Sequence, residues 1–335
     1  MRVDDIRPEE LVRENLALYA KDVERLMERS GEFEILFACP ACRKGAYEVA
    51  QSVVFTKDGF IHKICSSCGT VFISPRPNRA LLLKYYSEAE SIKHWATKLF
   101  PATVAQRREH VFAPRAWEVR RVCEREGLAP KIVLDVGAGY GTFCEELIKL
   151  LPDTHVVAVE PSPYLALHCR LSGLAVMMTS IEGMDLNQEV DVVTAFELLE
   201  HLFDPHDLVE AARRVLVPGG LLYVTTPNVD GFELATVGSA SENFGGPNHL
   251  QLLTPCALRV LLEAHGFEVL DLDTPGELDA SIVRMEALRC HVDLSRQPFL
   301  RTVLVDRWEE LGSDFQAFIA EHGLSSHMRA VARKR

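Results

Sequence analysis

Residues 132–143 read IVLDVGAGYGTF, and this stretch decides the fold. An apolar, β-branched run leads to Asp135, glycines follow at positions 137, 139 and 141, and a helix is expected to begin near Thr142. The pattern predicts a strand, a tight turn and a helix start. Glycine lets such a turn pass close to a ligand, because no Cβ stands in the way. A glycine-rich turn is a weak signal alone, so the rest of the chain has to support a binding site here.

Strands and helices alternate along the chain after this turn. Further strands are expected at 154–160, 175–178, 190–196, 221–226, 267–271 and 327–332. Helices are expected at 205–215, at 254–264 and within 280–323. The alternation predicts an α/β fold with a Rossmann-like, doubly wound, seven-stranded and mostly parallel sheet. Ligands of such sheets bind beyond the carboxyl ends of the strands, where acids and glycines collect in this chain.

Length and composition limit the class of protein. The chain has 335 residues, of which 47% are apolar and 25% charged, as in ordinary globular proteins. No apolar run reaches the roughly 18 residues of a membrane span. Residues 1–5 lack the apolar core of a signal peptide, so we expect a cytoplasmic protein. Nine cysteines favour reduced thiols over a disulfide framework. The formal charge of −12 disfavours a polyanionic partner such as nucleic acid.

Two cysteine pairs stand apart from the other five cysteines. Cys39 and Cys42 form one Cys-x-x-Cys pair, and Cys65 and Cys68 form the second. The sequence between the pairs alternates like a β-hairpin with a turn at 57–59. Two such pairs joined by a hairpin predict a tetrahedral thiolate site for structural Zn²⁺. Four thiolates close the coordination shell, so we expect no catalysis at this metal.

The remaining regions complete a four-part organisation. Residues 1–35 hold an amphipathic helix at 7–29, which is interpreted either as a packing helix or as the contact of a homodimer. Residues 36–77 form the zinc-ribbon module, and residues 78–130 form a helical linker or cap. Residues 131–335 form the main domain, with a helical insert at 280–323.

Four motifs resemble those of class I S-adenosylmethionine-dependent methyltransferases. Residues 135–141 (DVGAGYG) resemble the first motif of that family, and Glu160 resembles its ribose-binding acid. Residues 191–201 (DVVTAFELLEH) are similar to its fourth-strand motif, and residues 217–222 (VPGGLL) to the loop before strand five. The nearest subgroup includes quinone O-methyltransferases and many sugar and natural-product methyltransferases, and some members of the wider group carry a four-cysteine zinc module. The resemblance covers roughly residues 115–335 and implies S-adenosylmethionine as the cofactor.

The resemblance also implies a set of cofactor-binding residues. They are Asp135, Gly137, Ala138, Gly139, Gly141, Glu160, Pro161, Ser180, Ile181, Phe196 and Glu197. The chemistry agrees, because nearby acids such as Asp135 and Glu145 suit a cationic sulfonium better than a pyrophosphate. The glycine spacing also lacks the third glycine of a dinucleotide-binding turn.

Two histidines are candidates for the chemistry of methyl transfer. His249 lies in a Gly-rich loop after strand five and is a candidate general base; the alternative is a loop histidine bonded to backbone. His201 follows Glu197 and Glu200 in an arrangement that binds a divalent metal in some quinone O-methyltransferases. The alternative for His201 is packing beside the cofactor.

Three functions compete. The first is methyl transfer to a small molecule, such as a sugar, a nucleotide sugar or a natural-product hydroxyl. The second is an RNA methyltransferase, favoured by six Lys/Arg against two Asp/Glu in residues 36–79 and opposed by the overall charge and the lack of a basic aromatic stripe. The third is a non-catalytic scaffold, which the intact glycines and Glu160 oppose. The sequence does not say whether oxygen, nitrogen or carbon is methylated.

Overall fold

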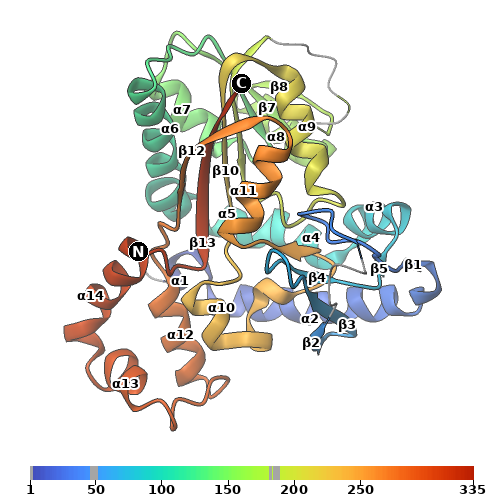
Figure 1. Cartoon of the computed structure of the whole chain (residues 1–335), viewed down its shortest axis with the longest axis vertical. Helices are drawn as coiled ribbons and strands as arrows, with labels where there is room; N and C mark the ends of the chain where they lie inside the picture. The colour runs from blue at the N-terminus through green and yellow to red at the C-terminus, as the bar shows by residue number, and fades with distance from the viewer. Residues whose placement is uncertain (1–2, 46–51, 181–182, 184–188) are drawn as a thin grey trace.

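The computed structural model describes residues 3–45, 52–180, 183 and 189–335. Its centre is a seven-stranded sheet in the order β12-β13-β10-β9-β6-β7-β8 (Figure 1). The strands are β6 (Ile132–Val136), β7 (His155–Val159), β8 (Ala175–Met177), β9 (Val190–Phe196), β10 (Leu216–Pro227), β12 (Phe267–Asp273) and β13 (His327–Lys334). Only β13 runs antiparallel to both of its neighbours, β10 and β12. The predicted α/β fold with a mostly parallel, seven-stranded sheet is confirmed.

One strand starts earlier than the sequence predicts. Residues 217–220 are expected to be a loop, but β10 begins at Leu216, which pairs with Val190 of β9. A register shift between Leu216 and Leu221 accommodates the turn residues, and Gly219 has a φ of +82° there. The two ends of β10 therefore pair with β9 on either side of this irregularity.

Helices cover both faces of the sheet. One face carries α6 (Ala113–Arg125), α7 (Thr142–Leu150) and α8 (Pro163–Leu171), and the other carries α9 (Pro205–Val215) and α11 (Pro255–Ala264). Successive residues of each strand belong to opposite apolar clusters: Val133 and Val192 join α6 and α7, whereas Leu134 and Val193 join α9 and α11. This period of two is the pattern of a strand buried on both faces.

The cysteine-rich region builds a second sheet in the order β11-β4-β3-β2. Its strands are β2 (Ser52–Lys57), β3 (Phe60–Ile64), β4 (Val71–Ile73) and β11 (Gln251–Leu252), and a two-stranded sheet of β1 (Phe33–Glu34) and β5 (Arg76–Pro77) lies next to them in sequence. The predicted hairpin is confirmed, with Asp58 and Gly59 at positive φ in its turn. β11 comes from the distant loop that carries His249, so two regions far apart in the sequence share one sheet.

N-terminal helices lie against the carboxyl edge of the main sheet (Figure 1). They are α1 (Val3–Ile6), α2 (Glu9–Met27), α3 (Arg79–Glu88), α4 (Glu90–His94) and α5 (Phe100–Arg107), and π-helical turns at 95–99 and 108–112 connect α4, α5 and α6. The predicted helix at 7–29 corresponds to α2. Its buried Asp22 accepts hydrogen bonds from the backbone N–H and the hydroxyl of Ser91, at 2.8 and 2.6 Å. The inner face of α2 therefore has a partner within the same chain.

Helices also occupy the segment between β12 and β13. They are α12 (Asp279–Leu288), α13 (Pro298–Arg301), a π-helical turn at 302–306 and α14 (Trp308–Glu321), and with α10 (Phe232–Val237) they enclose an apolar cluster of their own. Among the described residues, no helix combines the length and apolar character needed to cross a membrane.

Candidate active site

The glycine turn connects β6 to α7 at the carboxyl edge of the sheet. Gly137, Gly139 and Gly141 have φ values of +74°, +57° and +74°, which residues with a Cβ rarely adopt. The backbone N–H groups of Gly137 and Ala138 both donate to the carbonyl of Val159, at 2.9 and 3.3 Å. These bonds fasten the turn to the end of β7.

The glycines of this turn face different surroundings. A Cβ on Gly141 would lie 2.3 Å from Leu174 and 3.0 Å from Cys169, so this position allows close helix packing. A Cβ on Gly139 would meet nothing within 4 Å. Gly139 therefore presents open space of the kind that a bound cofactor fills.

Glu160 follows β7 and faces the same turn. One carboxylate oxygen accepts the backbone N–H of Gly139 and the other accepts that of Ser162, both at 2.9 Å. Burial raises the pKa of Glu160, while these two hydrogen bonds act in the opposite direction. Its neighbour Pro161 is exposed, as is Ser180 beyond the end of β8. The predicted Ile181 lies outside the described residues.

Asp135 lies beneath the turn. Its carboxylate accepts the hydroxyl of Thr194 at 2.7 Å and contacts the thiol of Cys144. Burial raises its pKa to about 7. The hydrogen bond to Thr194 links β6 to β9 under the glycine turn, so the described contacts of Asp135 support the sheet. Glu145, the second nearby acid, forms an ion pair with Arg108.

Glu197 directly follows β9 at the same edge, with an unusual φ of +49°. It accepts the hydroxyl of Thr225 at 2.6 Å and lies 3.1 Å from the guanidinium of Arg115 and 3.4 Å from Nδ1 of His327. Burial would raise the pKa of Glu197, but His327, Arg115 and the Thr225 hydroxyl together lower it. Phe196 stacks under the same Arg115, with 5.0 Å from its ring centre to the guanidinium carbon.

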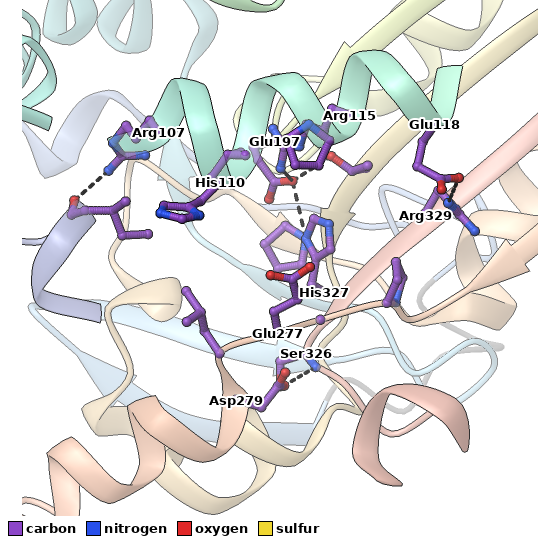
Figure 2. Close-up of a pocket in the computed structure, with 18 of the residues that line it drawn as sticks. Arg107, His110, Arg115, Glu118, Glu197, Glu277, Asp279, Ser326, His327 and Arg329 are labelled. Carbon is purple, nitrogen blue, oxygen red and sulfur yellow. Dashed lines mark hydrogen bonds and ion pairs between the residues drawn. The ribbon is translucent and has the colours of Figure 1, made fainter. Parts of the chain in front are cut away.

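A cavity of about 630 Å³ opens beside Glu197 (Figure 2). The α5–α6 helices form one wall, residues 275–282 form the other, and Glu197, Thr225 and His327 lie at its base. Because these residues end β9 and β10 and begin β13, the cavity lies at the carboxyl edge of the parallel strands, where such sheets bind ligands.

His201 and His249 form a separate cluster with Glu200. The two rings are 4.7 Å apart, and Nε2 of His201 lies 3.9 Å from a carboxylate oxygen of Glu200. Nδ1 of His201 lies 2.7 Å from the carbonyl of Asn248, and Nδ1 of His249 lies 2.7 Å from that of Asn243. A carbonyl accepts only, so each Nδ1 carries the proton and each Nε2 is an acceptor.

The two histidines of this cluster are neutral, so each can donate an electron pair to a metal ion. Burial lowers the pKa of both histidines, and that of His249 falls to about 3 with a further contribution from His201. Burial and the charge of Glu197 raise the pKa of Glu200. One donor atom from each of Glu200, His201 and His249 lies within 4.8 Å of the others, a geometry that can hold a divalent cation. Glu197 does not belong to this group, and His249 does not line the cavity.

Comparison with known proteins decides the family. A model of the methyltransferase domain matches residues 104–272, half of the chain. The chain belongs to this family of methyltransferases. The ubiquinone biosynthesis O-methyltransferase of Xanthomonas oryzae pv. oryzae (strain PXO99A) is 33% identical over 165 residues, which cover 46% of this methyltransferase and 67% of that relative. The protein of the same name from Pseudomonas savastanoi pv. phaseolicola (strain 1448A / Race 6) is 36% identical over 118 residues, 33% of this chain and 50% of that one.

A solved structure also aligns with this chain, at lower identity. The structure of the plantazolicin methyltransferase BpumL in complex with SAH aligns with 76% of this methyltransferase and 94% of that chain, with 14% identity and a TM-score of 0.49. The predicted assignment to class I S-adenosylmethionine-dependent methyltransferases is confirmed by the family match. The open side of Gly139 and the carboxylate of Glu160 fit this cofactor.

No sequence motif singles out Arg107, Arg115 or His327, although all three line the cavity of the methyltransferase. The two arginines carry no motif signal. A topological signal exists for His327: an antiparallel strand begins where its parallel neighbours end, so the first residue of β13 reaches the ligand edge. Recognising β13 as antiparallel would have pointed to it.

The two Cys-x-x-Cys pairs of the methyltransferase converge. Sγ of Cys39 lies 3.6 Å from that of Cys68, and Sγ of Cys42 lies 3.7 Å from that of Cys65. Four sulfurs on a tetrahedral Zn²⁺ with bonds of about 2.3 Å are about 3.8 Å apart. The thiols are therefore spaced as such a site requires.

Proposed function

We propose that this methyltransferase methylates a small molecule, with a sugar, nucleotide-sugar or natural-product hydroxyl as the acceptor class. The supporting observation is the cavity beside Glu197, whose volume of about 630 Å³ lies in the usual range of small-molecule sites. The O-methyltransferase names of the relatives support oxygen as the acceptor atom. A concave site of this size favours a small acceptor over a folded RNA.

The cofactor supplies an activated methyl group, and the protein supplies alignment. In this proposal Glu160 accepts the ribose hydroxyls, and the backbone at Gly137, Ala138, Gly139 and Gly141 borders the amino-acid end. The remaining contacts are those predicted from the sequence, with Pro161, Ser180 and Ile181 toward the adenosine and Phe196 and Glu197 beneath the cofactor. Arg115, beside Glu197, is a suitable partner for the cofactor carboxylate.

Two histidines compete as the proton acceptor. His249 is the base proposed from the sequence, but it groups with Glu200 and His201 and does not line the cavity. Burial lowers the pKa of both His249 and His327, so position rather than basicity separates them. His327 lines the cavity, and Glu197 lies 3.4 Å from its Nδ1, which orients the ring as an acid orients a catalytic histidine. The geometry therefore favours His327 for this role.

The test begins with a panel of hydroxyl acceptors and a measurement of S-adenosylhomocysteine release. With an active acceptor, His327→Gln is expected to lower kcat by about 100-fold or more, as the loss of a general base does. Cofactor affinity, measured by calorimetry, should change little. A normal kcat in His327→Gln with a collapsed kcat in His249→Gln would assign the base to His249 instead.

We also propose that Cys39, Cys42, Cys65 and Cys68 bind one structural Zn²⁺. The sulfur spacing supports this, and four thiolates leave no open position for substrate. The site lies within the apolar cluster that includes Leu208 of α9, so the metal would stabilise the contact between the cysteine-rich region and the main sheet.

A further inference from the structure

Arg107 is a cavity-lining guanidinium at the end of α5. Its Nε donates to the hydroxyl of Thr103 at 3.0 Å, and its Nη2 donates to the carbonyl of Ile6 at 2.9 Å. Both acceptors are neutral, and no carboxylate pairs with Arg107 in the described part of the chain. Its second terminal nitrogen, Nη1, makes no described hydrogen bond.

The other guanidiniums of the cavity are neutralised. Arg115 lies 3.1 Å from Glu197, and Arg329 pairs with Glu118 at 3.0 Å and also with Asp273. Within the described lining of the cavity, Arg107 is thus the arginine whose charge has no protein counterion.

The acids of the opposite wall do not compensate the positive charge of Arg107. Asp279 accepts the backbone N–H of Ser326 at 2.5 Å and the hydroxyl of Ser325 at 2.7 Å, and Glu277 is exposed. A half-buried charge without a counterion is costly unless a ligand supplies one. In agreement, burial together with the charges of Arg7 and Arg115 lowers the pKa of Arg107 to about 10, and no carboxylate acts in the other direction.

His110 lies on the same wall, three residues further along. Figure 2 shows its ring pointing into the cavity beside Arg107. Neither ring nitrogen has a hydrogen-bond partner among the described residues. The two side chains therefore offer free N–H donors to one region of the cavity, and Ile6 and Val111 supply apolar surface next to it.

We propose that the methyl acceptor carries an oxyanion, a carboxylate or a phosphate, that binds to Arg107 and His110. This inference rests on the proposed function and narrows its substrate class. Arg107 precedes Arg115 by eight residues, and the π-helical turn at 108–112 separates them. The oxyanion of the acceptor thus lies apart from the Glu197 end of the cavity, where Arg115 is available for the cofactor.

The test uses matched ligands on the full chain saturated with S-adenosylhomocysteine. Benzoate and benzamide have nearly the same shape and differ in charge, and phenyl phosphate represents the second oxyanion. Calorimetry should show at least one of the two anions binding about tenfold or more tighter than benzamide, as a charge-assisted hydrogen bond provides. Arg107→Gln should abolish this preference, His110→Gln should weaken it, and Arg107→Lys should retain it.

Arg259→Gln is the matched control, because Arg259 is exposed, pairs with Glu263 on α11 and does not line the cavity. Equal binding of all three probes by the wild type would overturn the proposal. So would an Arg107→Gln variant that loses affinity for S-adenosylmethionine while keeping its preference for anions, since Arg107 would then serve the cofactor. A wild type that binds no S-adenosylmethionine would instead contradict the proposed function, and circular dichroism excludes unfolding as the cause of any loss.

Discussion

Replacement of two glycines in the glycine turn should affect different properties: stability for Gly141 and cofactor affinity for Gly139. Gly141→Ala would place a Cβ 2.3 Å from Leu174 at a φ of +74°, so we expect the free energy of unfolding to fall by about 2–4 kcal/mol. Gly139→Ala meets no protein atom and should cost only about 1–2 kcal/mol for its positive φ. Its added methyl group enters the proposed cofactor space, so S-adenosylmethionine affinity should fall. Denaturant unfolding and calorimetry separate the two effects, and an unchanged cofactor affinity in folded Gly139→Ala would contradict this assignment.

Asp135 should make stability depend on pH. Burial raises its folded-state pKa to about 7, so the folded protein holds this proton at a pH where the unfolded chain has released it. The stabilisation is complete below about pH 4 and is lost as the pH rises toward 7. Asn can still accept the Thr194 hydroxyl without ionising, so the free energy of unfolding of Asp135→Asn relative to wild type should rise between pH 5 and 7 by up to about 1.4 kcal/mol per unit.

Denaturant unfolding at several pH values measures this dependence. Asp153→Asn is the control, because it makes the same substitution at an exposed position. Parallel pH profiles for wild type and Asp135→Asn would show that Asp135 is ionised in the folded protein throughout.

Local signals explain which of these residues could be predicted. A positive φ at Gly137 and an acid ending a strand leave a trace in the sequence within a few residues. Arg107 and His327 leave no such local trace, because a helix and a final strand that lie 220 residues apart bring them to one cavity. Asp135 was predicted as a cofactor contact, and only the structure shows its carboxylate bonded to Thr194.

At the scale of elements, β11 joins the cysteine-rich region to the cluster of Glu200, His201 and His249. The backbone N–H of Ile73 in β4 donates to the carbonyl of Leu250, and that of Leu250 donates to the carbonyl of Glu200. His249 is thus held between the two sheets. A strand of two residues has no periodicity, so the sequence could predict the hairpin of the cysteine-rich region but not this fourth strand.

Loss of zinc should therefore reduce catalysis more than cofactor binding. In Cys39→Ser/Cys42→Ser we expect metal analysis to show one Zn²⁺ per chain lost, and kcat to fall because β4 no longer fixes the loop that carries Asn243, which lines the cavity. Affinity for S-adenosylmethionine should stay within about threefold, since the glycine turn is fastened to β7 instead. Cys256→Ser, at an exposed position, is the control.

Metal analysis also examines the histidine cluster. Wild type with one equivalent of zinc supports a site confined to the cysteines. A second equivalent that disappears in His249→Ala would show that Glu200, His201 and His249 hold an ion as well. An unchanged kcat in the zinc-free cysteine variant would contradict the proposed link through β11.

At the scale of the whole molecule, elements from both ends of the chain surround one edge of one sheet. The N-terminal helices, the π-helical turns before α6 and the helices after β12 all border the cavity or the glycine turn (Figure 1). The alternation of strands and helices follows from local patterns and could be predicted. The enclosure could not, because it depends on contacts between segments that are separated by most of the chain.

Tyr140 connects the helices that surround the cavity to the glycine turn. Its ring stacks on Phe100 of α5, with ring centres 4.6 Å apart and planes within 4°, and its hydroxyl donates to the carbonyl of Ala96. Tyr140→Ala removes both contacts, so amide hydrogen exchange across residues 95–112 should accelerate about tenfold or more, given about 1 kcal/mol for each contact. Tyr140→Phe keeps the stacking and should show a smaller effect. Tyr164→Ala, which removes a half-exposed ring from the edge of Tyr140, is the control, and equal exchange in the two alanine variants would mean that Tyr140 does not hold the helices over the turn.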